Sequence, residues 1–142
     1  MVLLLAIWSC ITGAQSTQEQ IQLTHPEIST PLVFNVQLPQ GYAAKTEKRY
    51  VLMFNFHPYS NTYLSGMHDW MSHNGEWPWL ETIIVTPQTG NQSAQLFDRS
   101  GVTTPLLDFF EDVLLPAIDK RYRTNGFRFI SGFRVDGSIV LS

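Results

Sequence analysis

The sequence predicts an α/β fold with a mostly parallel central sheet that is flanked by helices. Two short, mainly apolar runs, at residues 50–56 and 82–86, have the length and composition of strands that are covered on both faces, and residues 128–131 are a third candidate. Long segments separate these runs, and parallel strands need such crossover connections. One of the segments, at 104–123, has the pattern of an amphipathic helix. Strands that alternate with helices are typical of a sheet with helices on both faces.

Composition and charge indicate a folded domain that binds neither nucleic acid nor a membrane surface. Hydrophobic residues make up 44% of the 142-residue chain and charged residues 15%, so the chain should collapse around a core. The net charge of -3 gives no basic surface for nucleic acid and no polybasic patch for a membrane. The length fits one domain or a piece of a larger one. Nothing in the sequence requires a cofactor.

The N-terminal residues have the features of a signal peptide. Residues 1–8 form an unbroken apolar run, which is too short for a membrane-spanning helix of about 20 residues. Small residues at 12–14 suit a cleavage site before Gln15, although the usual positive n-region is missing. We therefore predict a signal peptide over 1–14, an exported protein that is periplasmic or secreted, and no stable membrane span. The alternative is a buried N-terminal strand. Cys10, the only cysteine, should leave with the signal.

A further strand is predicted before the three apolar runs. Apolar residues recur there at every second position, which indicates a strand with one face inward. They are Leu32, Phe34, Val36 and Leu38. A proline and a glycine at 39–42 end the strand in a turn. We predict a flexible leader over 15–29 and a folded domain over 30–142.

A long loop rich in aromatic residues and histidine is predicted between 58 and 80. His68, Asp69 and His73, together with His57, could form a metal cluster, but the five-residue spacing of two of these histidines suits no common helical ligand pair. We favour loop histidines near a cleft and predict no metal site. The tryptophans of this region could line a cleft for an aromatic ligand or pack under the loop. They are Trp70, Trp77 and Trp79.

The helix at 104–123 is marked by its ends and by its apolar stripe. Thr104 is a suitable N-cap and Pro105 suits the first helical position. Apolar residues recur at three- and four-residue spacing. They are Leu106, Leu107, Phe110, Val113, Leu114, Ala117 and Ile118. Pro116 should kink the helix because it removes a backbone donor. A turn at 125–126 then leads into the third apolar strand.

The turn that follows this strand lies between two glycines, Gly132 and Gly137. A strand that breaks sharply between close glycines exposes the residue at the apex, and in hydrolases this residue is the nucleophile of the G-x-S-x-G elbow. The apex residue here is Arg134, whose guanidinium stays protonated and cannot be a nucleophile. Ser131 precedes the turn and Ser138 follows it, so neither occupies the apex.

Four landmarks, taken in this order, resemble the N-terminal half of the serine-esterase branch of the α/β-hydrolases. This branch includes esterase D-like enzymes and periplasmic esterases that cut trilactone siderophores. The landmarks are an "LPxGY" opening at 36–42, a central strand that leads to the oxyanion loop at 50–57, an "ELIPYIDKRY"-like helix at 114–122 and an "I-x-G-x-S-x-G-G"-like elbow at 130–137. The resemblance covers residues 30 to 140. It implies an α/β-hydrolase fold that is truncated after the nucleophile elbow.

The resemblance also implies roles for individual residues. Arg134 stands where the family has its nucleophilic serine. The backbone amides of Tyr59 and Val135 would be the donors to an oxyanion, and His57 or Pro58 stands where the family usually has glycine. The family's acid and histidine follow the nucleophile in chain order, so both would lie beyond Ser142.

Two hypotheses of different classes follow. The first is a serine-esterase-like hydrolase of carboxylic esters, including siderophore-type esters, in which Arg134 makes the 142 residues inactive on their own. The alternative is a catalytically dead anion-binding or scaffolding module that uses the Arg134 cation, or a truncated fragment of a larger esterase. The expected partner is a small-molecule ester or an anionic ligand. The open edge of a half sheet would also allow a homo-oligomer.

Overall fold

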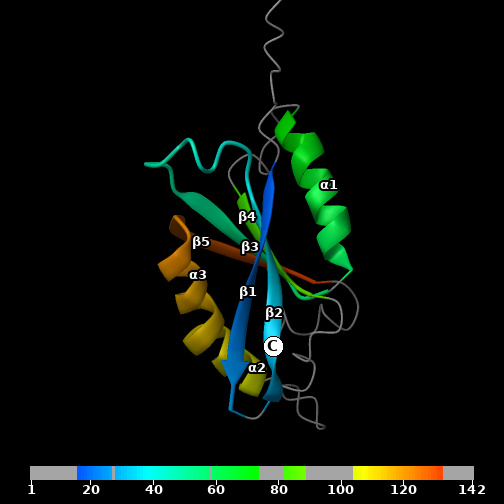
Figure 1. Ribbon diagram of the computed structural model, residues 1–142, viewed down its shortest axis with the longest axis vertical. Coiled ribbons are helices and arrows are strands. Elements are labelled where there is room, and N and C mark those ends of the chain that lie inside the picture. Colours follow the sequence, from blue (N-terminus) through cyan, green and yellow to red (C-terminus); the bar gives the residue numbers. More distant parts are fainter. Residues whose placement is uncertain (1–15, 27, 58, 74–81, 89–103, 133–142) are drawn as a thin grey trace, which may run out of the picture.

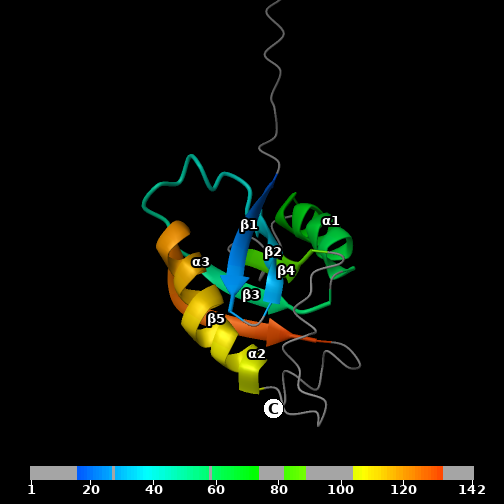
Figure 2. The same cartoon turned by 60° about the horizontal axis from the view of Figure 1, so that its bottom comes forward.

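The computed structural model describes residues 16–26, 28–57, 59–73, 82–88 and 104–132. Within them, one sheet contains five strands in the order β1-β2-β4-β3-β5. The strands are β1 Thr17–His25, β2 Ile28–Leu38, β3 Tyr50–Asn55, β4 Thr82–Pro87 and β5 Thr124–Ser131. The helical segments are α1 Ser60–His73, α2 Thr104–Phe109, the π-helical η3 Phe110–Leu114 and α3 Leu115–Arg121. Helix α1 covers one face of the sheet, and α2 and α3 cover the other (Figures 1 and 2). The α/β architecture is therefore confirmed.

The sheet is parallel in its three apolar strands and antiparallel in the other two. Strand β3 lies between β4 and β5 and runs parallel to both. Strand β2 is antiparallel to β4 and to β1. The three runs predicted as parallel strands are thus β3, β4 and β5. Their side chains alternate between the two faces, so Leu52 and Phe54 enter the larger core and Met53 enters the smaller one under α1. The predicted burial on both faces was wrong for β5, whose Arg128 and Ile130 are exposed because this strand lies at the edge of the sheet.

Strand β1 occupies most of the segment for which the sequence predicted a flexible leader. It pairs antiparallel with β2 from Thr17, opposite Leu38, to His25, opposite Ile28. Ile21 is buried in the core. The prediction of a leader over 15–29 was wrong at 17–25, because backbone pairing with β2 stabilises a strand whose side chains are mostly polar and partly exposed.

The inward face of β2 is as predicted. Leu32, Phe34, Val36 and Leu38 are all buried in the larger core. On the opposite face of β2, Asn35 and Gln37 are also buried, and hydrogen bonds satisfy their amides. Gln20 Nε2 donates to Asn35 Oδ1 at 3.0 Å, and Ser65 Oγ on α1 donates to Gln37 Oε1 at 3.2 Å.

The predicted kink at Pro116 takes the form of a π-helical turn. The N–H of Leu115, directly before the proline, donates to the carbonyl of Phe110 five residues back. Pro116 has no N–H and its ring crowds the carbonyl four residues earlier, so a wider turn relieves the conflict. The helical segment still turns Phe110 and Ile118 toward the sheet, where both are buried.

Helix α1 lies where the sequence predicted a loop, at 58–80. Leu64 and His68, four residues apart, face the sheet and are buried. Leu64 packs with Met53 and Ile84, and His68 Nε2 donates to the carbonyl of Thr82 at 3.0 Å. The prediction of a loop was wrong at 60–73, because tertiary contacts hold a helix whose sequence has little apolar periodicity. None of the helices among the described residues is long and apolar enough to cross a membrane.

Candidate functional site

A pocket of about 330 Å³ lies where β3 ends and α1 begins. Its lining comprises Asn55, His57, Tyr59, Ser60, Tyr63 and Leu64. In open α/β sheets, ligands bind in the crevice outside the carboxyl ends of the strands. Asn55 is the last residue of β3, so the pocket occupies this position.

Asn55 joins the two chain segments that meet at the pocket. Its Oδ1 accepts the backbone N–H of His57 at 3.0 Å, and its Nδ2 donates to Ser131 Oγ at 2.8 Å. Ser131 is the last residue of β5 and, as predicted, lies on the strand before the turn. One amide side chain therefore fixes the start of the turn into α1 against the end of the strand that leads to Arg134.

The turn into α1 brings together two residues that the sequence singled out. The N–H of Ser60 donates to the carbonyl of His57 at 3.0 Å, which closes the turn. The rings of His57 and Tyr59 have centroids 5.7 Å apart. Tyr63, one turn into α1, completes the aromatic side of the pocket.

The amino end of α1 adds a favourable electrostatic field at this place. Ser60, its first residue, lines the pocket. The positive end of a helix dipole attracts anions, and no acidic side chain in the first turn of α1 offsets it. The pocket is therefore suited to a group that carries or develops negative charge.

Other predicted site residues lie apart from the pocket or outside the described residues. His68 is buried between α1 and β4, and no three metal-ligating side chains in the described part of the chain gather into a metal site. Trp70 is exposed on α1. Six residues that the sequence singled out lie outside the described residues: Pro58, Trp77, Trp79, Arg134, Val135 and Ser138. The side chains of Asp69 and His73 are likewise not described.

Sequence reasoning missed Asn55 and Tyr63. An asparagine that ends an otherwise apolar strand was the available signal for Asn55, since a buried strand end rarely carries an amide without a partner. Tyr63 gave no signal, because the surrounding segment was predicted as a loop.

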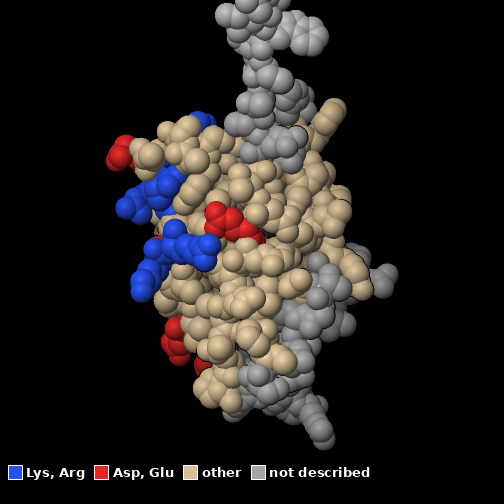
Figure 3. Space-filling model, in the orientation of Figure 1, with Lys and Arg blue, Asp and Glu red and all other residues tan. Residues whose placement is uncertain are grey.

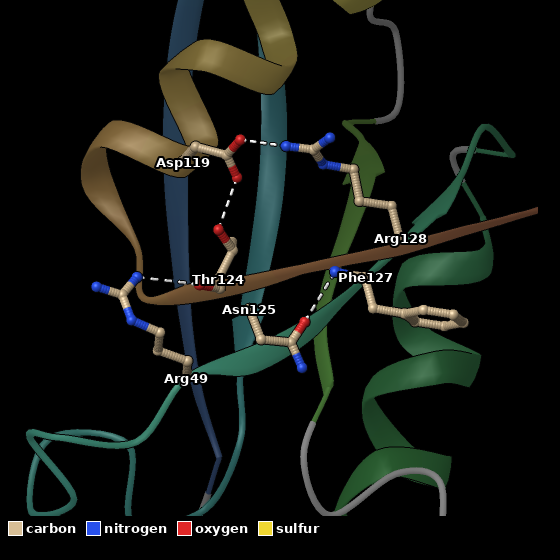
Figure 4. A network of polar contacts seen from close by, with 6 residues as sticks. All are labelled: Arg49, Asp119, Thr124, Asn125, Phe127 and Arg128. Carbon is tan, nitrogen blue, oxygen red and sulfur yellow. Dashed lines mark hydrogen bonds and ion pairs between the residues drawn. The ribbon is translucent and has the colours of Figure 1, made fainter.

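A polar network holds the other end of the same strands (Figure 4). Asp119, near the end of α3, accepts a hydrogen bond from Thr124 Oγ1 at 2.7 Å and forms an ion pair with Arg128. Arg49, just before β3, donates to the carbonyl of Thr124 at 3.2 Å. Gly126, with φ of 86°, lies in an irregularity where β5 shifts register against β3. The network fixes the register of β5 and thereby the place of Ser131.

Arg123 secures the predicted turn at 39–42 to the end of α3. Its guanidinium lies 3.8 Å from the ring centroid of Tyr42, and its backbone N–H donates to Tyr42 Oη at 3.0 Å. Its Nε also donates to the carbonyl of Lys48 at 3.2 Å. The landmark turn at 36–42 is thus held by the residue that directly follows the landmark helix at 114–122, and both support the sheet rather than the pocket.

Comparison with known proteins identifies the fold. The chain matches no family model. No curated protein matches it. Solved structures do: a ferulic acid esterase superposes with a TM-score of 0.68 and 25% identity over 89% of this chain and 53% of its own. An IroE-like serine hydrolase from Shewanella oneidensis superposes with a TM-score of 0.64 and 17% identity, over 80% of this chain and 42% of its own. The siderophore hydrolase EstB from Aspergillus nidulans superposes with a TM-score of 0.64 and 14% identity, over 84% of this chain and 50% of its own.

These structural neighbours are esterases of the α/β-hydrolase type, and the chain has the α/β-hydrolase fold. It spans about half the length of the structures that it matches.

Proposed function

We propose that the chain is a serine-esterase-like α/β-hydrolase whose pocket binds a carboxylic ester. The observation that carries the proposal is the place of the pocket, at the carboxyl end of β3 and beside the end of β5, under the positive end of α1. The esterases among its structural neighbours support the same reaction class.

The hydrogen bonds of the turn favour Tyr59 as an oxyanion donor. Asn55 already accepts the N–H of His57, so the backbone amide of Tyr59 is the better candidate on this side of the pocket. We propose the amide of Val135 as the second donor, as the resemblance implies. The His57 ring lines the pocket and would contact the bound ester.

Arg134 at the nucleophile position should prevent turnover. A guanidinium can hold a carboxylate or an oxyanion but cannot attack an ester carbonyl. We therefore propose that the 142 residues bind an ester or its carboxylate product without cleaving it. Siderophore-type and aryl esters are the first substrates to test, because neighbours are named for siderophores and for ferulic acid.

We also propose that the protein is exported, with residues 1–14 as its signal peptide. Amino-terminal sequencing of the protein recovered from a secreting bacterial host should begin at Gln15. Recovery of the whole chain from the cytosol would contradict export.

Hydrolysis of p-nitrophenyl acetate by the purified chain tests the proposed lack of turnover. We expect a rate equal to that of buffer for the unmodified chain and for Arg134→Ala. Measurable hydrolysis that disappears in Arg134→Ala would mean that Arg134 takes part in the reaction, and it would overturn the proposal.

A further inference from the structure

The solvent side of α1 carries aromatic side chains where a soluble domain usually places polar ones. Tyr63 and Trp70 are 65% and 66% exposed, and Tyr59, just before the helix, is 71% exposed. The side of α1 that faces the sheet contributes the smaller Leu64 and the polar His68 to the buried interior. Exposed apolar patches of this kind often mark binding surfaces.

The helical period places the exposed rings in one row. Tyr63 and Trp70 are seven positions apart, which is about two helical turns and a rise of about 10 Å. Tyr59, directly before α1, lines the pocket together with Tyr63 and so lies at the start of this row. Gly66 lies between Tyr63 and Trp70, and no atom lies within 4 Å of the position that a Cβ would take there. We call Tyr59, Tyr63, Gly66 and Trp70 the α1 strip.

The α1 strip continues directly from the pocket. Tyr59 and Tyr63 line the pocket and also present exposed ring surface outside it. A ligand that leaves the pocket along α1 would pass over Tyr63 and the open backbone at Gly66 before it reaches Trp70. The strip and the pocket therefore suit two parts of one ligand.

The surroundings of the strip favour a neutral ligand. Asp69 is the only residue of the α1 sequence that is Asp, Glu, Lys or Arg. Figure 3 shows the Lys, Arg, Asp and Glu side chains on the side of α3, while the described surface on the side of α1 shows none in this view. Exposed aromatic side chains bind flat apolar ring faces, whereas charged polymers such as nucleic acids need basic partners, and the α1 sequence contains no Lys or Arg.

We propose that the α1 strip is a second binding subsite, which holds a flat, neutral ring of the ligand on Trp70 while the ester group occupies the pocket. The inference rests on the proposed ester-binding function of the pocket. It adds that the natural ligand is extended, with a ring about 10 Å beyond the part that the pocket holds. An aryl ring and the apolar face of a sugar ring share this chemistry.

Two neutral esters, benzyl acetate with one ring and dibenzyl succinate with two, test the proposal through their dissociation constants in NMR titrations. Dibenzyl succinate should bind about three- to tenfold more tightly, beyond the twofold advantage of having two equivalent ends, because it adds one stacked ring. Trp70→Ala should remove this advantage and leave the affinity for benzyl acetate unchanged.

Phe127→Ala is the matched control, because Phe127 is 64% exposed on β5 and lies outside the strip. This variant should retain the full advantage of dibenzyl succinate. Circular dichroism should show that both variants remain folded, since both side chains are exposed.

Three results would overturn the inference. Binding of benzyl acetate with no added advantage for dibenzyl succinate would refute the α1 strip as a subsite and leave the pocket intact. Absence of benzyl acetate binding would refute the proposed function, and the subsite with it. Binding to phosphatidylcholine vesicles that is lost in Trp70→Ala, without any preference for the two-ring ester, would assign the strip to a lipid surface.

Discussion

Asn55 makes both of the hydrogen bonds that join the turn into α1 to the end of β5. Its carbonyl oxygen and its amide nitrogen are each used once, so its side chain is fixed in one orientation. Aspartate could accept from His57 in the same way, but its contact with Ser131 would need the serine hydroxyl to donate, and this hydroxyl already donates to the carbonyl of Phe54 at 3.5 Å. The amide of Asn55 therefore matches both of its partners as they are arranged in the structure.

Asn55→Ala should lower the free energy of unfolding by about 1–3 kcal/mol, because two partly buried hydrogen bonds are lost. It should also weaken binding of benzyl acetate, since the turn that carries His57 is no longer fixed. Urea denaturation and the same NMR titration measure the two effects.

Asn125→Ala is the control for this change, because Asn125 makes a similar but exposed bond from Phe127 N to its Oδ1 at 3.0 Å. Its loss should cost about 0.5 kcal/mol or less and leave ligand binding unchanged. Equal losses of unfolding free energy in the two variants would contradict the larger contribution that we assign to the hydrogen bonds of Asn55.

Tyr122 links stability to alkaline pH. Burial, and then a hydrogen bond from its hydroxyl to Glu19 at 3.1 Å, raise the pKa of Tyr122 from 10.0 to about 12. The folded state keeps the phenol proton where the unfolded state loses it, so this contribution is complete below pH 10 and is lost as the pH rises from about 10 to 12.

Tyr122→Phe should therefore flatten the fall in stability across this range of pH, while Tyr63→Phe, at an exposed ring, should not. Urea denaturation between pH 9 and about pH 11.5 measures both slopes. A fall as steep in Tyr122→Phe as in the unmodified chain would contradict the assignment.

At the scale of elements, the segment from α2 to α3 is held to the sheet largely by aromatic contacts. The ring of Phe110, in the π-helical turn, lies 4.6 Å from that of Phe54 and 5.7 Å from that of Phe56. Phe110→Ala should cost about 3–5 kcal/mol, because it removes a buried ring and leaves a cavity. Phe127→Ala, at an exposed ring, should cost about 0.5 kcal/mol or less. A loss below about 1 kcal/mol for Phe110→Ala in thermal denaturation would contradict this packing.

The elements that could be predicted from the sequence are those in which the pattern of apolar residues matches the pattern of burial. Strands β3 and β4 are mainly apolar and buried on both sides, and the alternating residues of β2 mark its inner face. Helix α1 was missed because its large apolar residues, Tyr63 and Trp70, face solvent. Strand β1 was missed because its pairing with β2 depends on the backbone.

The candidate site could be predicted only in part, for a similar reason. His57 and Tyr59 were singled out through a resemblance at the end of β3, and the structure brings both to one pocket. The partnership of Asn55 with Ser131 spans 76 positions of the sequence, so only the parallel pairing of β3 and β5 places the two residues together.

At the scale of the whole molecule, the two ends of the parallel strands differ in their chemistry. Ion pairs and charge-assisted hydrogen bonds, among them those of Arg49, Asp119 and Arg123, gather at the amino end of β3 and β5. The pocket lies at the carboxyl end, about 17 Å away along β3 at the usual rise of a strand. The polar network can therefore stabilise the sheet without placing its charged side chains in the binding site. Residues of the pocket can likewise be substituted without breaking the contacts of the network.

The most direct test of ester binding in the pocket is a titration of isotope-labelled protein with benzyl acetate, followed through its backbone amide NMR signals. We expect the largest shifts at Asn55, His57, Tyr59 and Tyr63, and none at Arg49 or Thr124 at the opposite end of the strands. An unchanged spectrum, or shifts that centre on the start of β5, would contradict an ester site at the carboxyl end of β3.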